Sequence, residues 1–218
     1  MKKIQIYFMP GLGANSKIFE HISLPKDQFE IHLLEWKIPV SEDESIKDYA
    51  QRMAYEIKHQ NPVLLGVSFG GVLVQEIAKI IAVKKIILVS SIKSHHEFPN
   101  RLKLLQKTKA YKFFPTKIIE NFDKYKKYFL GDFLKKRADL YTLYLSVNDS
   151  LYLKWAIYTL LHWQQDKIPE NILHIHGNND HVFPSKHIHN FTQINNGTHV
   201  MILLKAKEIS EIIIKSFN

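Results

Sequence analysis

Short apolar runs rich in β-branched residues recur along the chain, and helical patterns separate most of them. Runs of this length without strict alternation are typical of strands buried on both faces of a parallel sheet. They span residues 4–9, 30–36, 62–67, 85–90, 172–177 and 191–195. The alternation predicts an α/β fold with an open, mostly parallel six-stranded sheet, right-handed crossovers and helices on both faces.

Helical patterns lie between and after these runs. Residues 44–59 predict a helix, and Ser41 and Glu44 have the spacing of a capping box at its start. Residues 69–82 predict a largely buried helix, and residues 205–217 predict an amphipathic C-terminal helix.

One segment breaks the alternation. Residues 91–165 are rich in Lys, Tyr, Phe and Leu, lack strand-like runs and predict several helices. Because they fall between the fourth and fifth strands, we expect a helical cap, inserted after the fourth strand of a single domain that spans residues 1–218.

Composition narrows the classes of protein. The chain has 218 residues and no cysteine, which excludes disulfides, thiolate metal sites and a cysteine nucleophile. The N-terminal apolar run ends at Pro10 and is too short for a signal peptide, and no stretch reaches the ~18 apolar residues of a transmembrane helix. We therefore expect a cytoplasmic protein.

The net charge of +9 is concentrated in residues 93–137, which hold 13 Lys and Arg against four acidic residues. Such a patch either attracts anionic partners or forms a solvated lysine-rich face, and we favour the second interpretation. No nucleic-acid partner is predicted, and the oligomeric state has no signal in the sequence.

The most specific motif is Gly-Val-Ser-Phe-Gly at residues 66–70. An apolar strand precedes Ser68 and a helix follows it, as in a nucleophile elbow, where a sharp turn presents the serine hydroxyl above the sheet. Glycines two residues on either side allow close approach of strand and helix. The Phe69 N–H, at the helix start, is a candidate donor for an oxyanion hole.

A serine nucleophile needs a base, and the base needs a carboxylate that orients it. His199 follows the last predicted strand, and Asp180 follows the fifth. The order Ser68, Asp180, His199 along the chain is the order found in α/β-hydrolases. Asp166 and Asp149 are the competing acids, but the first precedes the fifth strand and the second lies in the cap.

The first strand runs into a glycine-rich loop, Pro10-Gly-Leu-Gly-Ala-Asn15, called the oxyanion loop below. Glycine there lets a backbone N–H approach the serine. The loop lacks the Gly-Lys-Ser/Thr ending and the G-x-G-x-x-G pattern of phosphate-binding loops.

Four segments, PGLGANSKIF, GVSFGG, HGNNDHVFP and NGTHVMI, together resemble the oxyanion, nucleophile, acid and histidine loops of the α/β-hydrolase superfamily. The resemblance covers residues 4–90 and 170–217. It implies an α/β-hydrolase fold without two N-terminal strands, and oxyanion N–H groups from Leu12 and Phe69, with Gly13 competing for the first position. It also implies an esterase-like enzyme without a cofactor, acting on a small-molecule acyl substrate through Ser68.

Several alternatives stay open. A receptor-like binding protein on the same fold is one, and hydroxynitrile lyase, cofactor-free haloperoxidase and C–C hydrolase activities are others. A metal hydrolase using His174, His176 and Asp180 is disfavoured, because the aspartate is two residues too far along the chain for the H-x-H-x-D-H pattern. We therefore predict no metal site.

Overall fold

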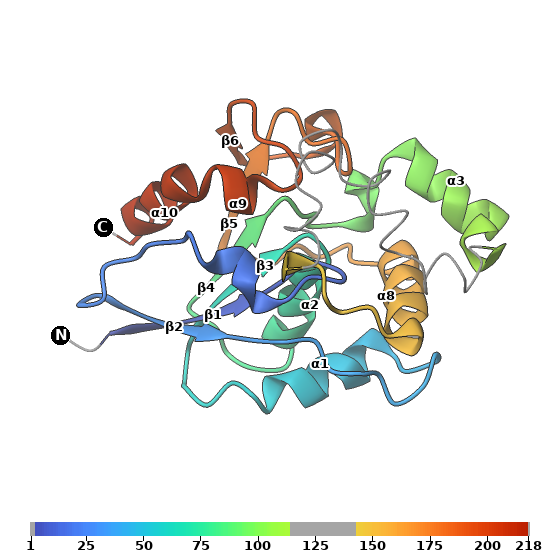
Figure 1. Cartoon of the computed structure of the whole chain (residues 1–218), viewed down its shortest axis with the longest axis horizontal. Coiled ribbons are helices and arrows are strands. Elements are labelled where there is room, and N and C mark those ends of the chain that lie inside the picture. The colour runs from blue at the N-terminus through green and yellow to red at the C-terminus, as the bar shows by residue number, and fades with distance from the viewer. Residues whose placement is uncertain (1–2, 114–142, 218) are drawn as a thin grey trace.

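The computed structural model describes residues 3–113 and 143–217, and its centre is one parallel sheet (Figure 1). The sheet has six strands in the order β2-β1-β3-β4-β5-β6, and every neighbouring pair is parallel. The strands are β1 (Ile4–Met9), β2 (Phe29–Leu33), β3 (Val63–Val67), β4 (Lys85–Val89), β5 (Ile172–Gly177) and β6 (Thr192–Ile194). The predicted six-stranded parallel sheet is confirmed.

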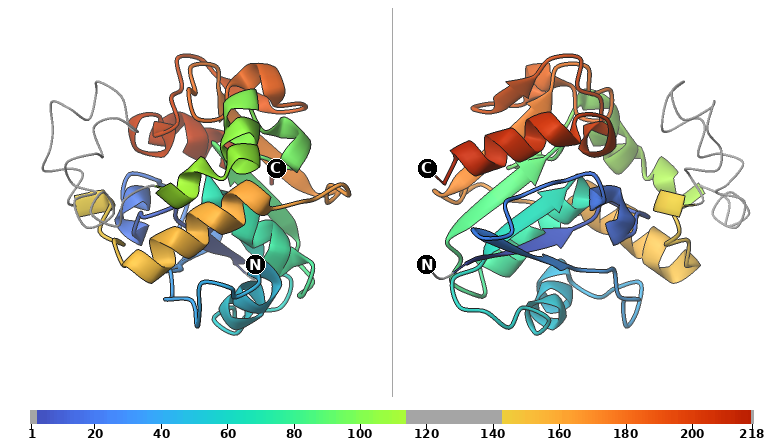
Figure 2. Two further views of the ribbon diagram at one scale, coloured as in Figure 1. Left: turned by 90° about the vertical axis from the view of Figure 1, so that its right-hand side faces the viewer. Right: turned by 60° about the vertical axis from the view of Figure 1, so that its left-hand side comes forward.

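Helices cover both faces of this sheet, as predicted (Figures 1 and 2). The α-helices are α1 (Ile46–Ala54), α2 (Phe69–Ala78), α3 (Asn100–Thr108), α8 (Ser150–His162), α9 (Met201–Leu204) and α10 (Ala206–Lys215). The 3-10 helices are η1 (Ser16–Phe19), η2 (His95–Glu97), η3 (Ala110–Phe113) and η4 (Ser185–His187). Helices α1, α2 and α8 share one core, whereas η1, α9 and α10 share the other.

Alternation along the strands divides the apolar side chains between these two cores. In β1, Tyr7 and Met9 face the core of α1, α2 and α8, whereas Ile6 and Phe8 face the core of α10. Successive side chains of a strand point to opposite faces, so a strand with a helix layer on each side must be apolar throughout. This explains the continuous apolar runs in the sequence.

The predicted start of the helix at residues 44–59 is wrong in detail. The side chain of Ser45, not Ser41, caps α1 by accepting the Asp48 N–H. Glu44 instead accepts hydrogen bonds from Arg52 (Nε···Oε1, 2.7 Å) and from the Val40 N–H. The Glu44 carboxylate, which the sequence assigned to the helix cap, therefore forms an ion pair with Arg52 instead.

Parallel strands place all their carboxyl ends at one edge of the sheet, where α/β proteins bind ligands. From β1 the chain moves outward to β2 and then returns to β3 on the other side of β1, so the strand order reverses between β1 and β3. The oxyanion loop follows β1, and Ser68 follows β3. Both lie at this reversal point.

The cap predicted at residues 91–165 lies partly outside the described residues, which omit 114–142. Its described parts include α3 and α8, which pack against each other (Figure 2). The cap itself stays a prediction. In residues 3–113 and 143–217, no helix combines the length and apolar character needed to span a bilayer.

Candidate active site

Ser68 lies in a strained turn between β3 and α2. Its backbone has φ 51° and ψ −120°, a conformation that is rare for residues other than glycine and is concentrated at functional sites. The flanking glycines are required by close packing: a Cβ on Gly66 would lie 2.4 Å from the Gly70 carbonyl oxygen, and one on Gly70 would lie 2.3 Å from that of Pro10. The strand, helix and oxyanion loop therefore meet at the serine.

His199 lies beside this serine, although 131 residues separate them in the chain. Its Nε2 is 3.0 Å from the Ser68 Oγ, and its Nδ1 is 2.9 Å from the Asp180 Oδ2. The Phe183 ring packs edge-on against the imidazole, with centroids 5.5 Å apart. The three side chains singled out in the sequence therefore form one hydrogen-bonded series.

Asp180 is buried at 3% exposure and accepts three hydrogen bonds. Its Oδ1 accepts the N–H groups of Val182 (2.7 Å) and Phe183 (2.9 Å), which leaves Oδ2 for His199. Burial acts to raise the pKa of this carboxyl, but the charges of His199 and His176, together with the hydrogen bonds from His199 and the Phe183 N–H, outweigh burial, and the pKa lies below its ordinary value. The carboxylate is therefore ionised at neutral pH and fixed in orientation.

The loops that carry Asp180 and His199 are packed directly on each other. A Cβ on Gly177 would lie 2.1 Å from the Gly197 carbonyl oxygen, and that oxygen accepts the Asn179 N–H (2.9 Å). The Asn178 side chain in turn accepts the Asn196 N–H (2.7 Å). The glycine and asparagine residues of the two loops make this contact, and they are the feature of the sequence that indicates it.

The oxyanion loop lies against the elbow, since a Cβ on Gly11 would be 3.5 Å from the Ser68 Cβ. Among residues 3–113 and 143–217, the N–H groups of Leu12 and Phe69 have no hydrogen-bond acceptor. The Gly13 N–H, in contrast, donates to the Tyr152 Oη (3.3 Å). This difference favours Leu12 over Gly13 as an oxyanion donor.

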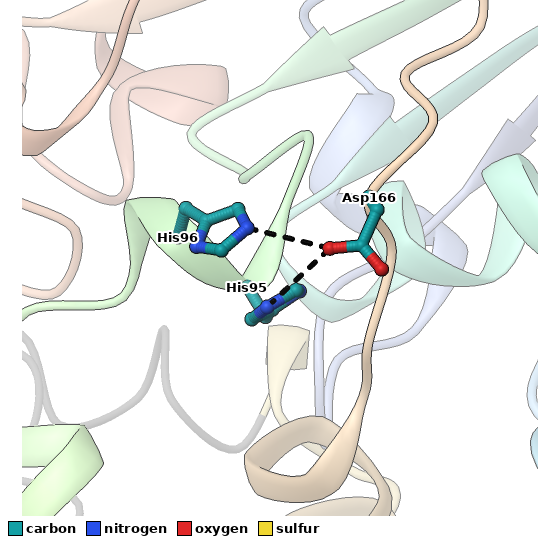
Figure 3. A group of neighbouring side chains, drawn as sticks. All are labelled: His95, His96 and Asp166. Carbon is teal, nitrogen blue, oxygen red and sulfur yellow. Dashed lines mark ion pairs between the residues drawn. The ribbon is translucent and has the colours of Figure 1, made fainter.

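The two competing acids lie elsewhere. Asp149 caps α8 by accepting the Tyr152 N–H, and Asp166 lies beside His95 and His96 (Figure 3). The Asp166 Oδ1 is 3.8 Å from the His95 Nε2 and 3.3 Å from the His96 Nε2.

His95, His96 and Asp166 lie close enough together to hold a metal ion, and they are the group in the described part of the chain that meets this condition. The Gln165 N–H, however, donates to the His95 Nδ1 (3.2 Å), so a neutral His95 carries its proton on Nε2. That is the nitrogen a metal would have to bind. The arrangement therefore fits a contact between histidines and a carboxylate better than it fits a metal site.

His174 and His176 lie on one face of β5 and are buried. Their Nε2 atoms lie within hydrogen-bond distance of backbone carbonyls, those of Ser91 (3.1 Å) and Phe183 (2.8 Å) respectively. Carbonyl oxygens only accept, so each ring donates from Nε2. This use of Nε2 favours a structural role for both histidines over the metal-hydrolase alternative.

Because these two histidines are buried, we expect the folded protein to become less stable in acid. Burial, with the charges of His176 and Lys93, holds the pKa of His174 well below its ordinary value, and burial also lowers that of His176 despite the opposing charge of Asp180. In the unfolded chain these two histidines take up protons near pH 6.5, and in the folded chain they do so only at lower pH, so the free energy of unfolding should fall as the pH falls from 7 to 5.

Thermal unfolding across this pH range measures the effect. The control is His174→Asn, which keeps a side-chain N–H donor but does not titrate, and it should reduce the pH dependence. An equal dependence in this variant would contradict the assignment to His174. Asp180 adds to the pH dependence only at lower pH. Its pKa is depressed, so its stabilisation of the fold is lost only as the pH falls through that lowered value.

No protein-family model and no curated protein matches the chain. Solved structures do match. A putative non-heme bromoperoxidase, BpoC from Mycobacterium tuberculosis H37Rv, has a TM-score of 0.74 at 12% identity, over 99% of this chain and 92% of that chain. A carboxylesterase structure from Nitrososphaera gargenis has a TM-score of 0.67 at 16% identity, over 99% and 90%.

The esterase EaEST from Exiguobacterium antarcticum has a TM-score of 0.70 at 16% identity, over 99% of this chain and 92% of that chain. At these identities the similarity concerns the fold. Together with the parallel sheet order, it shows that this protein has the α/β-hydrolase fold.

Proposed function

We propose that this protein is a serine hydrolase that cleaves a carboxylic ester of a small molecule through an acyl-enzyme on Ser68. The observation that carries the proposal is the series of hydrogen bonds from the Ser68 Oγ through the His199 imidazole to the Asp180 carboxylate, at 3.0 and 2.9 Å. Similar structures described as esterases and carboxylesterases support the same class of reaction.

In the first half of the reaction, the Ser68 Oγ attacks the ester carbonyl while His199 Nε2 accepts the hydroxyl proton. Asp180 stabilises the imidazolium that forms, because its carboxylate faces the Nδ1–H. The tetrahedral oxyanion accepts hydrogen bonds from the N–H groups of Leu12 and Phe69. His199 then returns the proton to the leaving alcohol, and the acyl-enzyme remains.

In the second half, His199 accepts a proton from water, which attacks the acyl carbon and forms a second oxyanion at the same two N–H groups. Collapse of this intermediate breaks the bond to Ser68, and His199 returns the proton to the serine. The products are a carboxylic acid and an alcohol. The cycle needs neither a metal nor an organic cofactor.

The test uses the whole chain, a fluorophosphonate probe and p-nitrophenyl esters of increasing acyl length. Labelling together with ester turnover supports the proposal. Absence of both over the whole ester series would contradict it and favour the receptor-like binding protein. Because the similar structure BpoC is described as a putative non-heme bromoperoxidase, the assay also includes bromide oxidation with hydrogen peroxide and a carboxylic acid.

A further inference from the structure

The oxyanion loop is held by two aromatic side chains from outside the Ser68, His199, Asp180 series. The Trp36 Nε1–H donates to the Gly11 carbonyl oxygen (2.9 Å), and the Tyr152 Oη accepts the Gly13 N–H (3.3 Å). Trp36 follows β2 and Tyr152 belongs to α8, so the two contacts come from separate parts of the fold. Leu12 lies between the two residues that are held.

The backbone of the oxyanion loop forms a tight turn, and the conformation of this turn depends on the contacts with Trp36 and Tyr152. The Ala14 N–H donates to the Gly11 carbonyl oxygen (3.0 Å), and Gly13 has φ 72°, which is the pattern of a type II turn with glycine in its third position. Rotation of the central Leu12–Gly13 peptide would convert such a turn to type I. The hydrogen bond from the Gly13 N–H to Tyr152 opposes that rotation.

Because the peptide group is planar, the hydrogen bond from Trp36 to the Gly11 carbonyl also fixes the direction of the Leu12 N–H. The peptide between Gly11 and Leu12 is trans, so its N–H points away from its C=O. The indole N–H fixes the direction of the Gly11 C=O, and this fixes the opposite direction of the Leu12 N–H. The Leu12 donor is therefore set from both sides, by Trp36 on the preceding peptide and by Tyr152 on the following one.

Packing joins this arrangement to the second donor. The Trp36 ring stacks on Phe69, with centroids 5.1 Å apart and an interplanar angle of 8°, and it also contacts Tyr152 at 5.3 Å. Trp36 and Tyr152 are 8% and 0% exposed. Burial holds the pKa of Tyr152 well above its ordinary value, so the hydroxyl is neutral.

We infer that Trp36 and Tyr152 are positioning residues for the oxyanion hole, which aim the Leu12 N–H at the oxyanion by holding the peptide groups on either side of it. This inference rests on the proposed function. Neither residue touches the reacting atoms; each acts through the loop. It also gives α8 a role in catalysis, since α8 supplies the hydroxyl that holds Gly13.

Two variants and two matched controls test the inference. Trp36→Phe removes the indole N–H, and Tyr152→Phe removes the hydroxyl. The controls, Trp155→Phe and Tyr49→Phe, remove equivalent groups from the same buried aromatic cluster. Among the residues that the structure describes, those groups bond only to the backbone of Glu44 and Lys37, not to the oxyanion loop.

With p-nitrophenyl acetate, Trp36→Phe and Tyr152→Phe should each lower kcat about tenfold, part of the loss expected for a missing oxyanion donor, with little change in KM. The controls should lower the Tm to a similar extent and leave kcat within about twofold. Equal losses of kcat in variants and controls, or an unchanged kcat in both variants, would overturn the inference.

A second readout does not depend on activity. The chain has eight glycines, so labelling with 15N-glycine gives a simple amide spectrum. Hydrogen exchange of the Gly13 amide should accelerate in Tyr152→Phe and stay unchanged in Tyr49→Phe; equal exchange in both variants would overturn the role of Tyr152. If the wild-type protein neither labels nor hydrolyses esters, the proposed function fails at that step, before any variant is compared.

Discussion

Replacing Ser68 with alanine should abolish fluorophosphonate labelling and reduce ester turnover about 10⁴- to 10⁶-fold. The Oγ is the only atom removed, and it is the atom that faces the His199 Nε2 at 3.0 Å. The residue would keep its positive φ, and the backbone hydrogen bond from its N–H to the Val89 carbonyl oxygen would remain. Circular dichroism and the Tm should therefore stay close to those of the wild-type protein.

Ser90→Ala is the matched control for this variant. Ser90 also directly follows a strand, β4, has φ 49° and is fully buried, and its hydroxyl has no hydrogen-bond partner among the described residues. Turnover and labelling of Ser90→Ala should equal those of the wild-type protein. Labelling that persists in Ser68→Ala, or that is lost in Ser90→Ala, would place the nucleophile elsewhere.

The sequence predicts the sheet and the elbow because both follow from local patterns. Burial on two faces produces the continuous apolar runs, and the turn at Ser68 requires small neighbours at positions 66 and 70. The positions of Asp180 and His199 follow from the same logic, since parallel strands bring their carboxyl ends to one edge. Topology converts three distant loops into neighbours without any information about individual contacts.

Contacts that depend on tertiary packing have no such local signal. Trp36 bonds to Gly11, 25 residues away, and Tyr152 bonds to Gly13, 139 residues away. A tryptophan and a tyrosine in apolar surroundings look like ordinary core residues, and both are core residues here. Their hydrogen bonds appear only when the loop and the helix are placed together.

The start of α1 shows how competing local signals mislead. Both Ser41 with Glu44 and Ser45 with Asp48 have the spacing of a capping box. The first pair is not used, because Glu44 forms an ion pair with Arg52, eight residues further along the chain. The second pair forms the cap, with the Ser45 Oγ accepting the Asp48 N–H at 3.1 Å.

Asp180→Asn should lower turnover about 10⁴-fold while leaving the fold intact. The amide keeps one oxygen, and the N–H groups of Val182 and Phe183 require an acceptor, so this oxygen should take the place of Oδ1. The new NH₂ group then faces the His199 Nδ1 and donates to it. The ring proton must move to Nε2, which then points at Ser68 as a donor and cannot accept the hydroxyl proton.

Asp166→Asn and Asp149→Asn are the controls, because they remove a charge at the two competing acids. Asparagine caps a helix about as well as aspartate, so α8 should keep its start in Asp149→Asn. Steady-state turnover at neutral pH should fall only in Asp180→Asn. If one of the controls loses turnover and Asp180→Asn keeps more than about a tenth of it, a different carboxylate orients the imidazole, because a histidine with its proton on Nε2 has no route to activate the serine.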